Sequence, residues 1–474
     1  MVKAYLPKVE VTLIKVVQRD RNRPKPATGP DSIIDLTPYL AEGSVVTFSR
    51  GINQPAGVFS IDFPDQMMPQ SRDTLYSMVE PMDIIEIRMA REPHKYPSGL
   101  PVVFRGFVSL IKRNEKMSGG KPQRRVVISG RDWGGIMQSI QIFYKKDYAV
   151  GQIIMDSFPM FSTYGVTLEY LSPSDFVSVI VDKIVTPWLD ALWKAAKVER
   201  RLRLEPKTTV TQGRVGTNGI QHYEGGIWGL LSSWTDLAWN ELIFDDDDGG
   251  SYLRYRAKPY RDIETGELVM SDAVEPDRVE MGADAVVSLN VERNIERVFN
   301  YFHVEAPQAV MNSVDLINVE AMQKGSVFVT DDPNTDPVIY GLRKLTEATT
   351  MTSPDNTNSV ADKPSDEQQS FIDQHNDWLG SRRDDLKGMR KDASVLESGS
   401  MTLRGNERIK PGVYIDIDRG AVKAEYYAQN VTHTFEVLGA YITEVEFIRG
   451  TGFIKRMETP NYLNETSRGV YGKS

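Results

Sequence analysis

Residues 102–111 read VVFRGFVSLI and residues 125–129 read RVVIS, with the loop NEKMSGGKPQ between them. Both segments are rich in β-branched and aromatic residues, and the Gly-Gly and Pro of the loop are typical of a turn. The two segments therefore predict a pair of adjacent strands, and the neighbouring sequence extends this pattern.

Short strands are predicted on both sides of this pair. Upstream they occupy Val9–Val17, Ser44–Phe48, Ala56–Phe63 and Asp83–Met89. They resume near the other end of the chain at Ala285–Asn294, Phe299–Ala306, Gly399–Arg404, Gly412–Asp418, Glu425–Phe435 and Tyr441–Arg449. Short strands separated by Gly, Pro and Asn turns predict a barrel or a sandwich.

The middle of the chain is predicted to contain helices. Ser172-Pro-Ser-Asp175 has the form of a capping box, which begins a helix. Apolar residues then recur at every fourth position: Phe176, Ile180, Ile184, Trp188 and Leu192. Pro187 should kink or break this helix because proline lacks the backbone N–H. A second helix is expected over Ile227–Trp239.

A hairpin with an acidic turn is expected next. Glu241–Phe244 and Ser251–Tyr255 would be its strands, joined by Asp245-Asp246-Asp247-Asp248-Gly249-Gly250. Four adjacent carboxylates repel one another, and a calcium ion bound at Asp245–Asp248 would relieve that repulsion. The run lacks the EF-hand spacing, however, which favours a solvated hairpin tip.

Residues 306–398 interrupt the later strands. They contain the polar stretches DDPNTDP and TSPDNTNSVADKPSDE, and a polar helix is expected from Glu367 to Arg390. This composition predicts an exposed insertion with mobile parts.

Composition excludes several kinds of site. The chain has 474 residues and no cysteine, which rules out disulfides, thiolate zinc sites and cysteine nucleophiles. No two histidines have the i, i+4 spacing of helix-borne metal ligands: His94, His222, His303, His375 and His433. A net charge of −9 argues against binding nucleic acid by neutralising its phosphates.

The N-terminal region differs in charge from the rest. Residues 1–30 hold seven basic and two acidic residues, which favours a solvated strand and loop over contact with an acidic partner. The first 17 residues lack the apolar core of a signal peptide. Because no run of about 18 apolar residues occurs, no membrane span is expected, and assembly should take place in a cytoplasm.

Sequence motifs of catalysis are absent. There is no Walker loop, no GxGxxG opening a helix, no HExxH and no GxSxG. Paired carboxylates of a hydrolase meet only in the fold, so that alternative stays open but less favoured. Trp228, Trp234 and Trp239 favour core packing over a sugar or base platform. His303 and His433 are expected to be ordinary strand residues. We therefore expect no catalytic, cofactor or metal site.

Three stretches carry a family resemblance by their order. The first is Val103-Phe-Arg-Gly-Phe-Val-Ser-Leu110 with Val126-Val-Ile-Ser-Gly-Arg-Asp-Trp133, which includes Asp132. The second runs from Ile227-Trp-Gly-Leu-Leu through Trp239-Asn-Glu-Leu and the aspartate run to Leu253-Arg-Tyr-Arg-Ala-Lys-Pro259. The third comprises Ser400-Met-Thr-Leu-Arg-Gly-Asn406, Ile409-Lys-Pro-Gly-Val413, Glu425-Tyr-Tyr-Ala-Gln-Asn-Val-Thr-His433 and Phe447-Ile-Arg-Gly450. Tyr340-Gly-Leu-Arg343 also fits.

In this order the stretches resemble the baseplate hub (tail hub) proteins of contractile-tailed bacteriophages. Those proteins are similar to the N-terminal hub-like part of type VI secretion spike proteins. The resemblance implies a mainly β fold with an α+β middle, built from two related β-barrel domains and a mixed helical and hairpin region. The expected division is a first barrel at 1–145, the mixed region at 146–282, a second barrel at 283–450 carrying the insertion at about 306–398, and a C-terminal tail at 451–474.

The function that the resemblance implies is structural and not enzymatic. A homotrimer would form a ring of six similar barrels that joins the hexameric tail tube to the trimeric central spike. Genomic DNA would pass through its lumen during ejection without specific binding. The expected partners are the tail tube protein, the central spike protein, the baseplate wedge proteins and, as a further candidate, the tape measure protein.

The expected location is the tail baseplate of the virion, after assembly in the host cytoplasm. Strands near Val103–Leu110 and Tyr426–Phe435 are expected at the contact between subunits. Two alternatives remain, a tail-associated peptidoglycan-degrading enzyme and a receptor-binding tail protein. Neither a lysozyme or peptidase segment nor a β-solenoid repeat is seen in the sequence.

Overall fold

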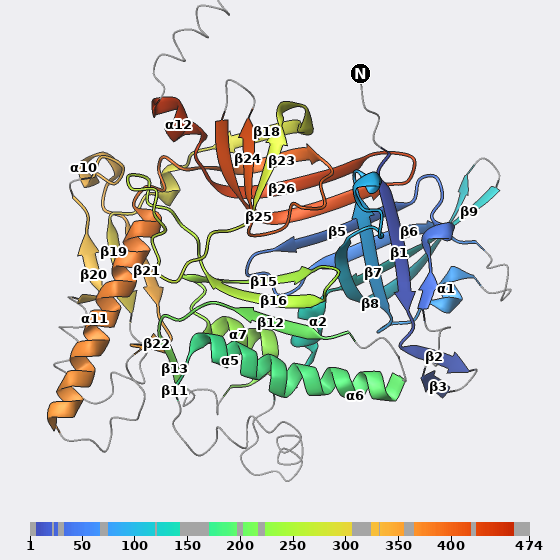
Figure 1. Cartoon of the computed structure of the whole chain (residues 1–474), viewed down its shortest axis with the longest axis horizontal. Helices are drawn as coiled ribbons and strands as arrows, with labels where there is room; N and C mark the ends of the chain where they lie inside the picture. The colour runs from blue at the N-terminus through green and yellow to red at the C-terminus, as the bar shows by residue number, and fades with distance from the viewer. Residues whose placement is uncertain are drawn as a thin grey trace, which may run out of the picture.

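The computed structural model describes residues 6–20, 23–26, 33–66, 74–118, 121–142, 170–196, 202–216, 223–305, 324–330, 332–354, 365–418 and 423–458. Strands fill the upper part of the view in Figure 1, and helices run along its lower and left margins. The prediction of a mainly β fold is confirmed. Its largest component is a sheet of 13 strands.

Two groups of strands make up this sheet. The first β unit comprises β1 (Lys8–Ile14), β5 (Val45–Gly51), β6 (Val58–Pro64), β7 (Ile84–Ala90), β8 (Val102–Ser118) and β9 (Lys121–Arg131). The second β unit comprises β17 (Arg278–Gly282), β18 (Val286–Glu292), β23 (Glu397–Arg404), β24 (Tyr414–Asp418), β25 (Lys423–Glu436) and β26 (Tyr441–Gly450). The short β4 (Ile33–Asp35) adds to β1 at one edge. Each of the strands expected at both ends of the chain is present, and all belong to this sheet except the one expected at Phe299–Ala306, which is observed at Tyr301–Glu305 in a separate sheet.

The two β units have the same strand order. The first runs β5-β6-β9-β8-β7-β1 and the second runs β18-β23-β26-β25-β24-β17, and corresponding strands also follow each other in the same order along the chain. One difference is that β1 is antiparallel to β7, whereas β17 is parallel to β24. The chain therefore contains a structural repeat that its sequence does not display.

The two β units join edge to edge. β25 of the second unit pairs antiparallel with β5 of the first, from Asn430 opposite Gly51 to Glu436 opposite Val45. Each unit keeps its own apolar core, the first around Phe59, Phe104 and Ile128 and the second around Ile415, Tyr426 and Phe447. One continuous sheet thus spans two separate cores.

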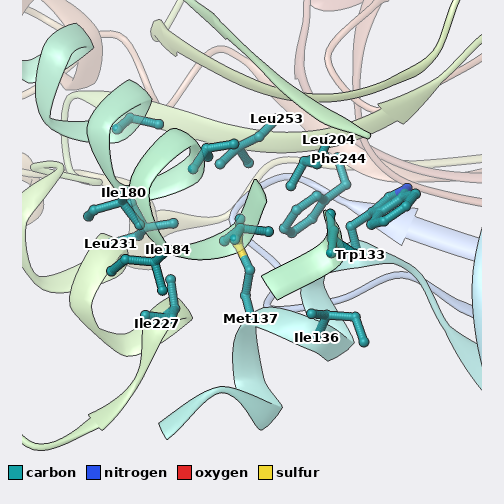
Figure 2. Packing of buried hydrophobic residues seen from close by; sticks show 14 of the residues in the cluster. Trp133, Ile136, Met137, Ile180, Ile184, Leu204, Ile227, Leu231, Phe244 and Leu253 are labelled. Atoms are coloured by element: carbon teal, nitrogen blue, oxygen red, sulfur yellow. The ribbon is translucent and has the colours of Figure 1, made fainter. Parts of the chain in front are cut away.

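The mixed middle packs beneath the junction. It contains the sheet of β12 (Leu204–Thr208), β16 (Ser251–Ala257) and β15 (Asn240–Asp246), and the helices α2 (Trp133–Ser139) and α7 (Ile227–Trp234). A long helical segment consists of α5 (Pro173–Ile180), a π-helical turn at Val181–Val185 and α6 (Thr186–Ala196). Figure 2 shows their apolar side chains meeting, with Met137 between Phe244 and Ile184.

The helical predictions are confirmed with two adjustments. Ser172 is the N-cap, and its side chain accepts a hydrogen bond from the backbone N–H of Asp175. The π-helical turn ends at Val185, two residues before the α6 residue Pro187, which matches the predicted disturbance of the helix. The helix predicted over Ile227–Trp239 is too long, because α7 ends at Trp234 and Asp236 has a φ of 46°.

The insertion is more ordered than its composition predicts. It contributes β20 (Ser326–Phe328), β21 (Lys344–Ala348), α10 (Pro337–Tyr340) and the 26-residue helix α11 (Ser365–Arg390), and β20 and β21 pair with β19 (Tyr301–Glu305), which precedes the insertion. Leu379, Leu386 and Met389 of α11 pack in one core with Trp239 and Phe302. The described part of the insertion is therefore packed against the rest of the protein and is not fully exposed as predicted. A mostly polar helix can pack in this way because a few apolar residues on one face are enough. The stretches 306–323, 331 and 355–364 lie outside the described residues.

Smaller elements complete the described part of the chain. Its remaining strands are β2 (Val17–Asp20), β3 (Arg23–Pro26), β10 (Gln141–Ile142), β11 (Tyr170–Leu171), β13 (Arg214–Gly216), β14 (Gly225–Gly226) and β22 (Met351–Thr352). The remaining α-helices of these residues are α1 (Leu75–Met78) and α12 (Gly452–Glu458). No helix in the described ranges combines the length and apolar composition that crossing a membrane requires.

Candidate functional site at the acidic hairpin

The acidic turn of the β15–β16 hairpin is the centre of a buried ionic network. Asp246 is fully buried, and it accepts hydrogen bonds from the guanidinium of Arg50, the hydroxyl of Ser251 and the backbone N–H of Arg105, the last at 2.8 Å. Arg50 belongs to β5 and Arg105 to β8. One carboxylate of the middle region therefore links two strands of the first β unit.

Asp132 is the second carboxylate on Arg50. Arg50 Nε donates to Asp132 Oδ2 at 3.0 Å, and Asp132 Oδ1 also accepts from Gly134 N at 3.0 Å as the N-cap of α2. Burial raises the pKa of Asp132 to about 6 even though Arg50 favours its ionised form. The aspartate that the sequence singled out thus anchors the N-terminus of α2 to Arg50 of β5.

Asp245 connects the hairpin to the second β unit. Arg254 Nη2 and Lys410 Nζ both donate to its carboxylate at 2.7 Å, and Lys410 also donates to the backbone oxygen of Asp246 at 2.7 Å. Burial on its own would raise the pKa of Asp245, but the two cations outweigh it and hold the pKa below its usual value. Lys410 lies in the loop before β24, so the network spans both β units.

The turn itself is held by backbone contacts. Asp247 Oδ1 accepts from Gly249 N at 2.7 Å and from Gly250 N at 3.0 Å. Arg105 Nη1 donates to the backbone oxygens of Asp247 and Gly250, both at 2.8 Å. Asp248 is exposed and accepts from Arg88 at 2.9 Å. The prediction of a solvated tip is therefore right for Asp248 but wrong for Asp245 and Asp246.

Cations of the protein itself neutralise the aspartate run. Arg50, Arg88, Arg254 and Lys410 each pair with one of its carboxylates. Throughout the described ranges, no three His, Asp or Glu side chains gather as metal ligands do. The charge repulsion that suggested a calcium ion is thus relieved by cationic side chains of β5, β7, β16 and the loop before β24.

A second link lies beside the first. Arg256 of β16 donates to Glu241 Oε1 at 2.7 Å, to the backbone oxygen of Gly412 at 2.6 Å and to the hydroxyl of Tyr427 at 3.0 Å. Tyr427 also donates to Glu241. A cleft of about 300 Å³ opens here, between the hairpin, β5 and the loop that contains Lys410. Both sets of contacts bind the hairpin to its neighbours, so the interactions of this site hold the middle region and the two β units together.

The predicted strand histidines have the expected roles. His303 lies in β19 with Nδ1 at 2.7 Å from the hydroxyl of Ser326. His433 lies buried in β25, with Nε2 at 3.0 Å from the backbone oxygen of Ile409 and Nδ1 at 3.0 Å from the hydroxyl of Tyr441. These contacts fit a neutral ring that donates through Nε2 and accepts at Nδ1. His222 lies outside the described residues.

The three tryptophans are core residues, as predicted. Trp239 is fully buried in the core that includes α11. Trp228 and Trp234 are partly buried against the core of the middle region. The three side chains pack in two different cores and do not line one face of a helix, because α7 ends before Trp239.

The sequence interpretation missed Arg50, Arg105, Glu241 and Lys410. Arg50 and Arg105 do carry a signal, since each is a charged residue within an apolar strand segment, SVVTFSR and VVFRGFV. Buried charges in such positions are rarely without a partner. The partners could not be identified because they are as far as 196 residues away in the chain.

Acid should destabilise the fold through His433 and His375. Burial lowers the pKa of each ring to about 4, whereas an unfolded chain takes up the proton near pH 6.5. Between these values the unfolded chain binds more protons, so stability falls as the pH is lowered from about 6.5 to 4. His433→Gln should reduce this dependence by about 1.4 kcal/mol per pH unit, measured as the urea-unfolding free energy at several pH values.

A matched surface substitution provides the control for that measurement. Val338→Gln, at a position that is 93% exposed, removes no titratable group and should keep the wild-type dependence on pH. An unchanged dependence in His433→Gln would contradict the assignment of a buried neutral ring.

Comparisons with known proteins find similar solved structures only. No family model matches the chain, and no curated protein matches it in sequence. A tail protein from Neisseria meningitidis has a TM-score of 0.49 and 10% identity, over 94% of this chain and 98% of that one. The 43 kDa tail protein of prophage MuSo2 from Shewanella oneidensis has a TM-score of 0.46 and 12% identity, over 93% and 98%.

A third similar structure comes from a secretion system. The E. coli protein c3393 is described as a type VI secretion component with structural similarity to bacteriophage T4 tail proteins. It has a TM-score of 0.35 and 8% identity, over 86% of this chain and 75% of that one. These three similar structures are thus of two phage tail proteins and one type VI secretion protein.

Proposed function

We propose that this chain is the structural baseplate hub of a contractile phage tail. Three copies would form a ring that surrounds the DNA channel and joins the hexameric tail tube to the trimeric central spike. The proposal includes the absence of enzymatic activity. Its starting point is the order of the three hub-like stretches, which run from Val103 to Gly450.

The observation that carries the proposal is the repeated β unit. Two units of six strands share one strand order and meet edge to edge through β5 and β25. A subunit that contains two similar units can present nearly the same surface twice. Three such subunits give six similar units, which is what a part between a sixfold tube and a threefold spike requires.

The ionic network suits this role. It fixes the acidic hairpin to both β units through Arg50 and Lys410, so the two units are held in one orientation. A ring closes only if that orientation is the same in every subunit. The net charge of −9 suits a channel through which DNA slides without binding.

The proposed partners follow from the position in the tail. The ring would contact the tail tube protein on one side and the central spike protein on the other, with baseplate wedge proteins around it and the tape measure protein as a further candidate in the lumen. Its location would be the tail baseplate of the virion, after assembly in the host cytoplasm. Residues 1–145 and 283–450 would form the two barrel domains.

The purified protein should be a closed trimer. Light scattering should give a mass three times 53.4 kDa, and negative-stain images should show rings with six similar lobes. The reason is that the second unit's edge is satisfied inside the chain by the first, which leaves corresponding edges for other subunits. A strict monomer at all accessible concentrations, or a fibre, would contradict the ring.

The same preparation tests the enzymatic alternative. Samples run on a peptidoglycan gel should leave no cleared zone. Clearing that follows the purified protein through successive columns would favour a tail-associated peptidoglycan-degrading enzyme.

A further inference from the structure

Two strands of the large sheet have an unused edge. β18 pairs only with β23, and the part of β8 beyond Val108 pairs only with β9 among the described residues. Both segments are exposed, with Val287 of β18 at 64% and Leu110 of β8 at 56%. Figure 1 shows the far end of the β8–β9 hairpin projecting from the body near the label β9. Open edges of this kind are templates for pairing with another chain.

β8 and β25 occupy corresponding positions in the two units, and their irregularities coincide. β8 shifts register against β9 between Val108 and Leu110, and β25 shifts against β26 between Ala428 and Asn430. The extra residue is Ser109 in one strand and Gln429 in the other. Because bulges mark fixed positions in a ladder, they align the two strands residue by residue.

The backbone beside each bulge repeats as well. Met82 N donates to Val108 O at 2.8 Å, and Gly412 N donates to Ala428 O at 2.8 Å. Met82 has a φ of 75° and Gly412 a φ of 83°, a region that non-glycine residues seldom occupy. The correspondence between β8 and β25 is thus supported by three independent features: strand order, bulge and backbone conformation.

The correspondence extends across each unit to its outer strand. In the first unit, one row of opposed residues runs Thr47, Ser60, Ser129, Leu110. In the second unit, the same row runs Asn290, Ser400, Glu446, Asn430. β5 therefore corresponds to β18, and Ser49 corresponds to Glu292.

Inside the chain, β25 uses its outer edge to bind β5. Thr432 lies opposite Ser49, and Thr432 Oγ1 is 3.0 Å from Ser49 Oγ. Ile52 N donates to Gln429 O, so these two opposite residues form a hydrogen-bonded pair of the antiparallel ladder. Because hydrogen-bonded and non-hydrogen-bonded pairs alternate along such a ladder, Thr432 and Ser49 form a non-hydrogen-bonded pair, in which the side chains lie closer together. This contact joins the first unit's β5 to the second unit's β25.

We propose that the same contact recurs between subunits, where β18 of one copy pairs antiparallel with β8 beyond Val108 of the next copy. The contact specifies how the proposed ring is closed and so rests on the proposed function. Its occupant is a second copy of this chain, because the internal β5–β25 junction supplies the template for both edges. The register of that junction places Lys112 of one copy opposite Glu292 of the other.

The charges of this pair support the assignment. Lys112 and Glu292 are both exposed, and neither has an ion-pair partner among the residues that the structure describes. Opposite charges directly across an antiparallel pair are favourable, whereas like charges are not. The hydrogen-bonded Thr432–Ser49 pair of the internal junction would thus be replaced between subunits by an ion pair.

The contact also corrects the expected interface. Tyr426–Phe435 is not an open edge, since the same chain occupies the outer edge of β25 there, with β24 up to Tyr427 and β5 from Asn430. Of the expected Val103–Leu110, only the last two residues belong to the open edge. The structure instead assigns the interface to β18 and to Ser109–Ser118.

Cysteine cross-linking tests the register, since the chain has no cysteine of its own. Lys112→Cys and Glu292→Cys together should form disulfides between subunits under a mild oxidant, giving covalent species up to three chains on a non-reducing gel. An equimolar mixture of the two single variants should give covalent dimers, and each single variant alone should not. Lys112→Cys with Val291→Cys should cross-link at least tenfold less, because a shift of one residue turns the second thiol to the other face.

Light scattering on the same samples separates the outcomes. A trimer that fails to cross-link, or that cross-links equally well with the shifted pair, would overturn this contact and leave the proposed ring standing. A strict monomer without cross-links would overturn both. A covalent ladder that continues past three chains would support the contact and contradict closure of the ring.

Discussion

Replacing Arg50 by methionine should lower the free energy of unfolding by about 3–5 kcal/mol, one of the two largest effects expected for a single substitution. Arg50 is buried, and its guanidinium pairs with Asp132 and Asp246, which are fully buried themselves. Methionine would fill much of the space but would leave Asp132 without its cation and Asp246 with only the Arg105 guanidinium, 3.9 Å away. The unfolding midpoint in urea, with the slope of the transition, measures the loss.

A matched variant shows whether burial is the cause. Arg88→Met removes a cation of β7 that pairs with the same hairpin. Its partner Asp248 is 61% exposed, so the loss of unfolding free energy through that pair should be about 0–1 kcal/mol. Arg88 also pairs with Glu86, which retains Arg105 as its buried partner at 2.8 Å. Equal losses in the two variants would contradict the assignment of Arg50 as the central cation.

A further variant asks what remains when the acids are neutralised too. Arg50→Met combined with Asp132→Asn and Asp246→Asn should recover part of the lost stability, because no buried charge is then left unpaired. Recovery would identify the cost in Arg50→Met as the burial of unpaired carboxylates. No recovery would assign it to lost packing, including the contact of the Arg50 guanidinium with the Phe104 ring at 4.3 Å.

Replacing Trp239 by alanine should cost about 3–5 kcal/mol and loosen α11 from the rest of the molecule. Trp239 is fully buried between the hairpin and the insertion, and its Nε1 donates to the backbone oxygen of Arg382 at 3.0 Å. The guanidinium of Arg382 lies 5.3 Å from the Trp239 ring and 4.3 Å from that of Trp378. Removing the indole would leave a cavity and deprive a buried cation of one of its aromatic neighbours.

Hydrogen exchange should resolve this effect in space. In Trp239→Ala, amides of α11 should exchange faster than in the unmodified protein, while those of β5 and β6 should change little. Trp228→Ala is the matched control, because Trp228 is only partly buried and packs against a different core. Faster exchange across the whole sheet would mean that the insertion and the β units unfold as one.

The two variants together describe how the molecule is built. Arg50 holds the acidic hairpin against the first β unit, and Trp239, the residue before β15, holds the same hairpin against the insertion. The hairpin is thus the common support for parts that are far apart in the chain. A ring component loaded by a tube and a spike would need such a rigid centre.

Much of the secondary structure could be predicted. The helix predicted from Glu367 to Arg390 is observed as Ser365–Arg390, and the capping at Ser172 is as expected. Turn residues and side-chain periodicity depend only on residues a few positions apart in the chain, so they can be recognised in a single sequence. The length of α7 was overestimated because the apolar pattern continues beyond Trp234, whereas the left-handed backbone at Asp236 depends on its bonds to Thr349 and Thr350.

The candidate site was only half predictable. The sequence identified Asp245–Asp248 as the most unusual charge feature, and composition made a solvated tip the natural interpretation. Burial of Asp245 and Asp246 depends on Arg50, Arg105 and Lys410, which come from β5, β8 and a distant loop. Such pairings are set by the tertiary arrangement of strands, and no local rule foretells them.

The sequence by itself determined the β-rich character of both ends, the turns between strands and the lack of cysteine chemistry, since these depend on composition and on near neighbours. The family resemblance implied two related β domains, but only the tertiary structure revealed that the two ends share one six-stranded order. The tertiary structure also decided that they are joined through residues as far apart as Ser49 and Thr432, separated by 383 positions. The physical reason is that strand pairing is made by backbone groups, which every sequence shares. The two units have the same bulge position, edge strands and register but different side chains. Those shared features become visible only when the strands lie side by side.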